Sequence, residues 1–290
     1  MADAFVCLRV RARAGPDAER VVAEAWAAGA SGVEERDGGA GATELLLYAP
    51  AARADAVARA VTEALGARAA LGAREAVPEH DWSARWRDGL AAVVISPRLA
   101  IRPSFVDFAP GPGQHVVVVD PGQAFGTGGH ASTRLALGLL DAFAAARAPG
   151  WSVLDVGTGS GVLALAALGL GAARALGCDL DRVALGEARS NAGVNGLAGR
   201  LTLFAGTLDA LGHARFDAVL ANLLRRELAP LLPALARLVA PGGVVILSGL
   251  LLEERAGLEA ALAREGLRVA QVREADDPAG DRWLGLTATP

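Results

Sequence analysis

The sequence contains no lysine, so arginine supplies all 28 of its basic side chains. Aromatic residues make up only 4% of the chain, and they do not alternate with arginine in any stripe. This pattern, together with a net charge of −4, gives no indication of direct nucleic-acid binding. A mildly acidic chain suits a basic protein partner, but charge alone does not identify one.

Cysteine is scarce, and long apolar runs are missing. Cys7 and Cys178 are the two cysteines, and neither belongs to a Cys-x-x-Cys pair, so neither a zinc site nor a disulfide framework is indicated. The first residues lack the basic and apolar regions of a secretory signal. Glycine and arginine interrupt the apolar stretches before they reach membrane-spanning length. We therefore expect a cytoplasmic protein without a metal site.

The length of 290 residues and the hydrophobic content of 52% predict two folded domains. Residues 1–77 contain no cluster of histidine, cysteine or acidic residues suited to chemistry, so we interpret them as a substrate-recognition domain. The residue pattern predicts the ferredoxin-like order βαββαβ. The expected strands are 5–10, 32–35, 43–48 and 68–77, and the expected helices are 17–28 and 51–65.

Residues 78–99 are predicted to form a linker that contains a short helix. Asp81 is placed to cap this helix, and Trp82 and Trp86 lie four positions apart on one face of it. Two roles stay open for the tryptophans. They either clamp the two domains together or form one wall of a substrate groove.

Residues 100–290 alternate between strands and helices, which predicts a Rossmann-like α/β domain. Segments such as 244–248 are apolar throughout, as a parallel sheet buried on both faces requires. The last two strands are separated by a short turn, so we expect them to be antiparallel at the sheet edge. The expected strands are 116–120, 152–155, 174–179, 201–205, 216–221, 244–248, 267–274 and 282–288. The expected helices are 132–146, 162–170, 182–195, 227–239 and 253–265.

A glycine-rich turn follows the strand at 152–155 and predicts a nucleotide-type ligand site. Gly157, Gly159 and Gly161 let a ligand approach the backbone, and the helix that follows is expected to present N–H groups. Nicotinamide enzymes share such a turn. Asp155 favours S-adenosylmethionine instead, because a carboxylate attracts a sulfonium and an ammonium and repels a pyrophosphate. A structural carboxylate that binds backbone N–H groups is the alternative.

Two further polar residues end neighbouring strands. Asp179 lies 22 positions after Gly157, where a carboxylate can accept hydrogen bonds from both ribose hydroxyls. Asp181 is expected to cap the next helix. Asn222 ends the strand at 216–221 and offers both a carbonyl and an amide to an amine or to the cofactor. A simple turn residue is the other interpretation of Asn222.

The loop from Asp120 to Thr133 is rich in glycine yet carries an aromatic residue, a histidine and two hydroxyls. Ser132 or Thr133 either caps the following helix or belongs to a binding loop. This loop closely resembles the D-P-G-x-A-F-G-T-G-x-H-x-[ST]-T signature of the ribosomal protein L11 methyltransferase family (PrmA). The resemblance continues at 155–161, 179–181, 221–224 and 247–250, in the tryptophan linker and in the N-terminal module, and so spans nearly the whole chain.

The resemblance implies a seven-stranded methyltransferase sheet and methylation of lysine side chains and the N-terminal amine of L11, with S-adenosylmethionine as the methyl donor. It implies cofactor contacts by Thr133, Gly157, Asp179 and Asn222, with Phe125 over the methyl donor. It identifies no general base, and His130 and Asn222 are candidates for orienting the substrate. Gly129, Ala131 and Arg225 depart from the residues usual in the family. We expect a monomer.

Three alternatives are weighed against this interpretation. A methyltransferase for a glutamine amide or a nucleobase would carry an Asn-Pro-Pro-aromatic turn, whereas Asn222 is followed by Leu223 and Leu224. A non-catalytic protein would bind the cofactor without transferring a methyl group. A nicotinamide oxidoreductase is disfavoured by Asp155.

Overall fold

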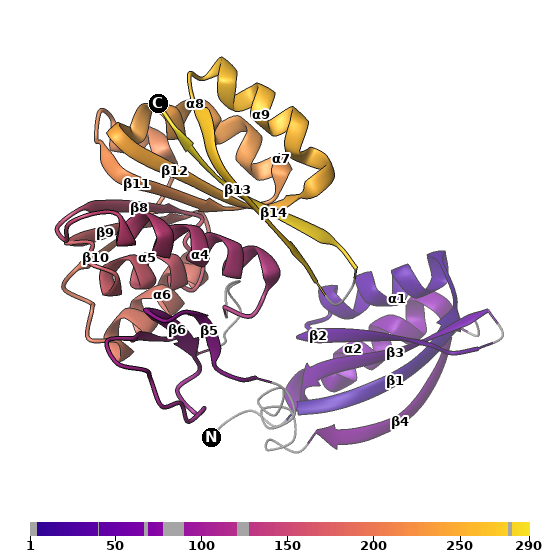
Figure 1. Ribbon diagram of the computed structural model, residues 1–290. Coiled ribbons are helices and arrows are strands. Elements are labelled where there is room, and N and C mark those ends of the chain that lie inside the picture. The colour runs from indigo at the N-terminus through magenta and orange to yellow at the C-terminus, as the bar shows by residue number, and fades with distance from the viewer. Residues whose placement is uncertain (1–4, 40, 67–68, 78–89, 121–127, 278–279) are drawn as a thin grey trace. The chain divides into compact units, whose positions relative to one another are not determined.

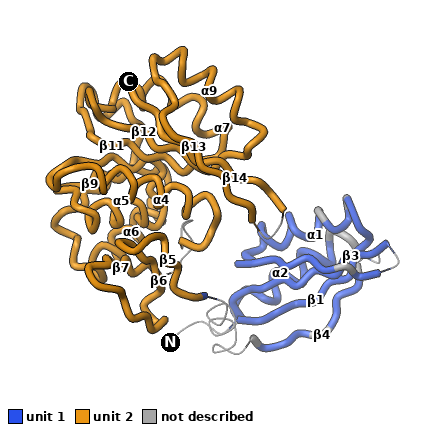
Figure 2. The backbone as a smooth tube through the Cα atoms, in the orientation of Figure 1, with its two compact units in different colours: residues 1–90 blue, residues 91–290 orange. Residues whose placement is uncertain are grey.

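The chain forms two compact units, residues 1–90 and 91–290 (Figure 2). The computed structural model describes residues 5–39, 41–66, 69–77, 90–120, 128–277 and 280–290. The predicted linker helix with Asp81, Trp82 and Trp86 lies outside the described residues, and so does Phe125.

The N-terminal unit is a four-stranded sheet with two helices on one face (Figure 1). Its elements are β1 (Phe5–Arg13), α1 (Pro16–Ala27), β2 (Gly32–Asp37), β3 (Ala42–Pro50), α2 (Ala51–Leu65) and β4 (Ala69–Val77). The strands lie in the order β2-β3-β1-β4 with antiparallel neighbours, which gives the expected βαββαβ arrangement. Alternate side chains such as Leu8 and Val10 are buried against the helices because successive residues of a strand face opposite sides.

The second unit is built on a seven-stranded sheet. Its strands are β8 (Ser152–Val156), β9 (Arg174–Asp179), β10 (Leu201–Ala205), β11 (Phe216–Asn222), β12 (Val239–Leu251), β13 (Arg268–Asp276) and β14 (Arg282–Thr289). They lie in the order β10-β9-β8-β11-β12-β14-β13. β10, β9, β8, β11 and β12 pair in parallel, and β14 is antiparallel to both of its neighbours. The predicted antiparallel pair at the sheet edge is confirmed.

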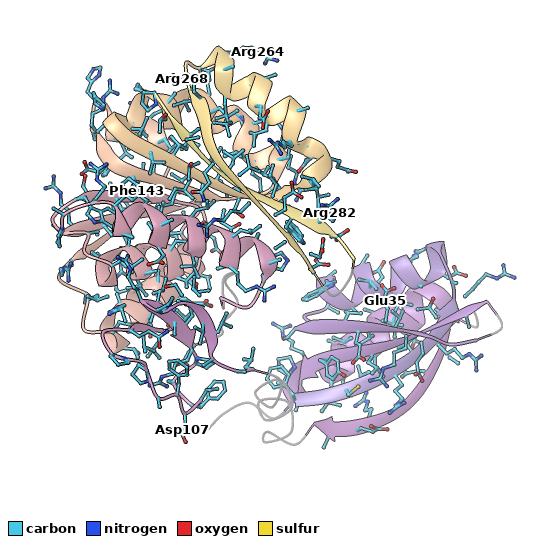
Figure 3. All side chains as sticks on the ribbon, in the orientation of Figure 1. Glu35, Asp107, Phe143, Arg264, Arg268 and Arg282 are labelled. Carbon is cyan, nitrogen blue, oxygen red and sulfur yellow. The ribbon has the colours of Figure 1, made fainter. Side chains whose placement is uncertain are left out.

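Helices cover both faces of this sheet (Figure 1). One face carries α4 (Ala131–Ala145), α5 (Val162–Gly169) and α6 (Arg182–Val194), and the other carries α7 (Arg225–Leu228), α8 (Leu232–Leu238) and α9 (Arg255–Arg264). The strands are mostly apolar because each one contributes side chains to the cores on both faces of the sheet. In β8, Val153 joins the first core and Leu154 the second. Phe143 of α4 (Figure 3) is packed against the first core. Its ring meets the ring of Trp151 edge-on at 5.3 Å.

A separate three-stranded sheet precedes the main one. It consists of β5 (Val93–Ser96), β6 (Leu99–Arg102) and β7 (His115–Val118). The sequence predicted a strand at 116–120, but it gave no indication of β5 or β6. Each has only four residues, too short for a clear alternation of apolar and polar side chains. β7 pairs in parallel with β6 and lies outside the seven-stranded sheet.

Two predicted elements differ in the structure. The helix expected at 227–239 is divided into α7, a 3-10 turn and α8, because Pro230 and Pro233 lack the backbone N–H that a continuous helix uses. Residues 241–243, which separate the predicted helix 227–239 from the predicted strand 244–248, lie inside β12. There the pairing with β11 jumps from Val239 to Val244, so the extra residues bulge out of the strand.

Candidate functional site

The predicted polar residues lie at the carboxyl end of the parallel strands. Asp155 is the fourth residue of β8, Asp179 ends β9, and Asn222 ends β11. Asn222 lies level with Ser248 in the neighbouring β12. Because parallel strands end at the same edge of the sheet, these residues lie along one edge. Ligands of open α/β sheets bind outside this edge, and we refer to the region as the crevice.

The glycine turn between β8 and α5 is closely packed. Gly157 has φ +66°, and a Cβ added there would lie 2.5 Å from Cδ2 of Leu223. Gly161 also has a positive φ, and its added Cβ would lie 3.1 Å from the Cβ of Ala188 on α6. The glycines are therefore required both by the backbone conformation and by their close neighbours.

The N–H groups of this turn are used within the chain. Gly157 and Thr158 donate to the carbonyl of Cys178 at 2.9 and 3.0 Å, and Gly161 donates to the carbonyl of Thr158 at 2.8 Å. Gly159 donates to Oδ2 of Asp179 at 3.0 Å. The turn is therefore a poor cradle for a pyrophosphate. We expected N–H groups for a ligand from the start of the following helix, α5, which begins at Val162, and the hydrogen bonds of these four residues do not test that expectation.

Asp155 is almost wholly buried, with 1% of its surface exposed. Its Oδ2 accepts hydrogen bonds from the Thr158 hydroxyl at 2.7 Å and from the Ala164 N–H at 3.2 Å, while its Oδ1 is buried without a hydrogen-bond partner. Burial raises the pKa of this carboxyl to about 6, although the two hydrogen bonds oppose the shift. One oxygen therefore has the structural role weighed above, and the other is left as an unused acceptor.

Asp179 connects the turn to the start of α6. Its Oδ1 accepts the Asp181 N–H at 3.0 Å, while its Oδ2 holds Gly159. Asp181 in turn caps α6 through the Val183 N–H at 2.8 Å, as predicted. Each Asp179 oxygen keeps a second lone pair for further donors such as hydroxyls. Leu180 beside it is 77% exposed, which gives this end of the crevice an apolar rim.

Asn222 and Thr133 are brought together although 89 positions separate them in the sequence. Nδ2 of Asn222 donates to the Thr133 hydroxyl at 3.2 Å, and Thr133 has no exposed surface. Oδ1 of Asn222 is buried and has no hydrogen-bond partner. A buried acceptor without a donor is costly, so this oxygen is a candidate ligand contact.

The start of α4 is organised by His130. Its Nδ1 accepts the Ser132 N–H at 3.2 Å and lies 2.8 Å from the Ser132 hydroxyl, so His130 is the cap and neither Ser132 nor Thr133 has that role. The imidazole meets the ring of Trp283 edge-on at 4.7 Å. Ser248 binds the Ser132 carbonyl at 2.8 Å. These contacts fix the helix turn that carries Thr133.

Several neighbours of the site were missed by the sequence analysis. Trp283 and Ser248 reach it from strands whose order the sequence does not specify. The side chains of Asn191 and Asn195 form hydrogen bonds next to the glycine turn and at the start of the 120–133 loop. We call this start, at Asp120, the loop root. The signal for this pair was two amides four positions apart on one helix face. In the described part of the chain, no three histidine, cysteine or acidic side chains gather to hold a metal.

The family model described as "Ribosomal protein L11 methyltransferase (PrmA)" matches residues 30–286. The chain belongs to this family. An L11 methyltransferase of Syntrophotalea carbinolica is 44% identical over 69% of this chain and 65% of its own length, and one of Sorangium cellulosum is 41% identical over 93% and 88%. A crystal structure of the L11 methylase of Lactobacillus delbrueckii subsp. bulgaricus has 34% identity and a TM-score of 0.61, covering 69% of this chain and 98% of that one.

Family membership confirms the predicted methyltransferase class and fold, and with them S-adenosylmethionine as the methyl donor. The nicotinamide oxidoreductase alternative is wrong, in agreement with the turn whose N–H groups are already used. None of the helices within the described ranges has the length and apolarity needed to cross a membrane.

Proposed function

We propose that this PrmA-family enzyme transfers methyl groups from S-adenosylmethionine to lysine side chains and the N-terminal amine of ribosomal protein L11. The observation that carries the proposal is the buried, unpaired Oδ1 of Asn222 beside Thr133, because an amine substrate supplies the N–H donor that this oxygen lacks. A ribosomal substrate supports a cytoplasmic location for the enzyme.

We assign the cofactor to the crevice formed by the glycine turn, β9, α4 and β11. Gly157 and Gly159 would allow close approach to the turn, Asp179 would accept the ribose hydroxyls, and Thr133 and Asn222 would line the reacting end. Asp155 would supply negative charge behind the turn, and we also assign Phe125 to this site from its place in the family signature. The unpaired oxygens of Asp155 and Asn222 fit a cation better than a phosphate.

When bound, S-adenosylmethionine supplies an electrophilic methyl group on a positively charged sulfur. The residues of the chain must then present a neutral amine. A lysine amine with a pKa near ~10.4 is neutral in only about one molecule in 2,500 at pH 7. A desolvated crevice lowers that pKa because burial disfavours the ammonium. Asn222 does not remove the proton, but its Oδ1 can orient the amine by accepting one N–H.

We assign residues 1–77 to substrate recognition, residues 78–99 to the linker and residues 100–290 to methyl transfer. This division is supported by the self-contained core of the N-terminal unit and by the placement of Asp155, Asp179 and Asn222 in the second unit. We further propose that the chain acts as a monomer and contacts its protein substrate without binding nucleic acid directly, in keeping with its net charge of −4.

The test is incubation of the purified chain with purified L11 and isotopically labelled S-adenosylmethionine, followed by intact-mass analysis. The expected result is a ladder of mass steps of one methyl group each on L11. L11 with chemically acetylated amines is the matched control and should gain no label. An unmodified L11, in the presence of a chain that binds the cofactor, would refute the substrate assignment.

A further inference from the structure

Asn191 on α6 joins two segments that are distant in sequence. Its Nδ2 donates to the carbonyl of Ser160 in the glycine turn at 2.9 Å, and its Oδ1 accepts the N–H of Asp120 at 3.4 Å. Only 4% of Asn191 is exposed, so both ends of its amide are used inside the protein. Asp120 is the first residue of the loop whose signature identifies the family.

Asn195, one helical turn later, strengthens the same connection. Its Oδ1 accepts the N–H of Val118 at 2.8 Å, and its Nδ2 donates to the carbonyl of Val118 at 2.6 Å and to that of Asn191 at 2.8 Å. It therefore pairs with the end of β7 much as a neighbouring strand would. The Asp120 carboxylate also accepts the Ser104 N–H at 2.7 Å, so the root of the loop is held from two sides.

α6 meets the glycine turn at three points along its length. At its start, Asp179 binds both the Gly159 N–H and the Asp181 N–H. In its middle, Ala188 packs so closely against Gly161 that a side chain at position 161 would have little room. In its last third, Asn191 binds Ser160. Among the contacts of the described residues, the third is the one that also reaches the loop root, so it links the two segments.

We infer that Asn191 is a positioning residue for methyl transfer, because it aligns the cofactor turn at Ser160 with the loop root at Asp120. This inference rests on the proposed function of the crevice. Asn191 reaches that crevice through Ser160 and Asp120, so its effect is indirect. A cofactor-binding turn and a loop root held by one rigid amide keep their relative position in every turnover.

Two variants of Asn191 separate its two hydrogen bonds. Asn191→Ala removes both. Asn191→Asp keeps an oxygen for the Asp120 N–H but replaces the donor to the Ser160 carbonyl with a second acceptor. Ser152→Ala is the matched control: it removes a hydroxyl that donates to Oδ2 of Asp217 at 3.0 Å, at the amino end of β8.

The measurements are the Kd of S-adenosylhomocysteine by calorimetry, the single-turnover rate of L11 methylation at saturating cofactor, and the melting temperature. Asn191→Ala should weaken cofactor binding and slow methyl transfer, each by roughly 10-fold or more. Asn191→Asp should also weaken binding and slow methyl transfer, because the link between the turn and the loop root needs both hydrogen bonds. Ser152→Ala should change neither the Kd nor the single-turnover rate, even if its melting temperature falls as far as that of Asn191→Ala.

Wild-type affinity and rate in Asn191→Ala would overturn the inference, as would equal losses in Ser152→Ala. If Asn191→Asp binds S-adenosylhomocysteine as tightly as wild type, the hydrogen bond to Ser160 has no role in cofactor binding. If Asn191→Ala fails to fold, the nearly isosteric Asp variant decides. If the wild-type chain binds S-adenosylhomocysteine but leaves L11 unmodified, the proposed substrate fails, and the affinities still decide the role of Asn191.

Discussion

Replacement of Asp155 by asparagine should stabilise the cofactor-free protein at neutral and alkaline pH. Burial raises the pKa of this carboxyl from 3.8 to about 6, so the charged form is disfavoured in the fold. The shift corresponds to about 3 kcal/mol. A raised folded pKa contributes stability that is fully present below the unfolded pKa of 3.8 and is lost as pH rises through 6.

The quantity to be measured is the change in the free energy of unfolding with pH. Between pH 5 and pH 8 this carboxyl should lower the free energy of unfolding by about 1.4 kcal/mol, and its removal should abolish that part of the decline. Asparagine can keep the contacts to Thr158 and Ala164 because its carbonyl oxygen can accept both hydrogen bonds. The assay is urea unfolding of wild type and Asp155→Asn at several pH values in that range.

A matched control removes the same charge nearby. Asp181→Asn deletes an exposed carboxylate, and asparagine caps a helix as well as aspartate does. Its stability difference from wild type should stay almost constant over the same pH range. A gap between wild type and Asp155→Asn that does not widen from pH 5 to pH 8 would refute the reasoning. The same variant should lose more affinity for S-adenosylmethionine than for neutral S-adenosylhomocysteine, because only the former carries a sulfonium.

Two further predictions concern the reacting end of the crevice and the turn. Asn222→Ala should lower the single-turnover rate of L11 methylation by roughly 100-fold. A rate close to that of wild type would remove Asn222 from the proposed mechanism. Gly157→Ala should lower the free energy of unfolding by at least about 1–2 kcal/mol, since alanine disfavours φ +66° and Leu223 must also move. Gly186→Ala, in a helix with open space around it, should stabilise slightly by comparison, as measured by urea unfolding.

The long buried strands and their order along the chain were predictable because their apolar runs are local signals. β9 and α2 have the predicted bounds, and the glycine turn lies where the sequence predicts it. The short strands β5 and β6 were not predictable, because four residues carry too little pattern and their pairing is set by tertiary contacts. Pro230 and Pro233 lie inside the helix predicted at 227–239, and each of them is a local signal for a break in it.

The site was predictable as a set of residues but not as a set of contacts. The strand ends locate Asp179 and Asn222, because position along a parallel strand implies position at the sheet edge. No local signal pairs Asn222 with Thr133, since a hydrogen bond across 89 positions depends on how α4 packs. Nor does the sequence show that the N–H groups of Gly157 and Gly159 donate hydrogen bonds to acceptors within the protein.

The position of β14 in the sheet has a consequence for biosynthesis. β14 lies between β12 and β13, so the hydrogen-bond ladder of β12 stays open on one side until β14 has been synthesised. The same strand carries Trp283, which packs on His130, and the carbonyl of Leu284, which accepts from Ser248. A nascent chain that has completed every earlier strand therefore still lacks the Trp283 ring that packs on His130 at the start of α4. The chain should acquire methyl-transfer competence after β14 has emerged from the ribosome that makes it.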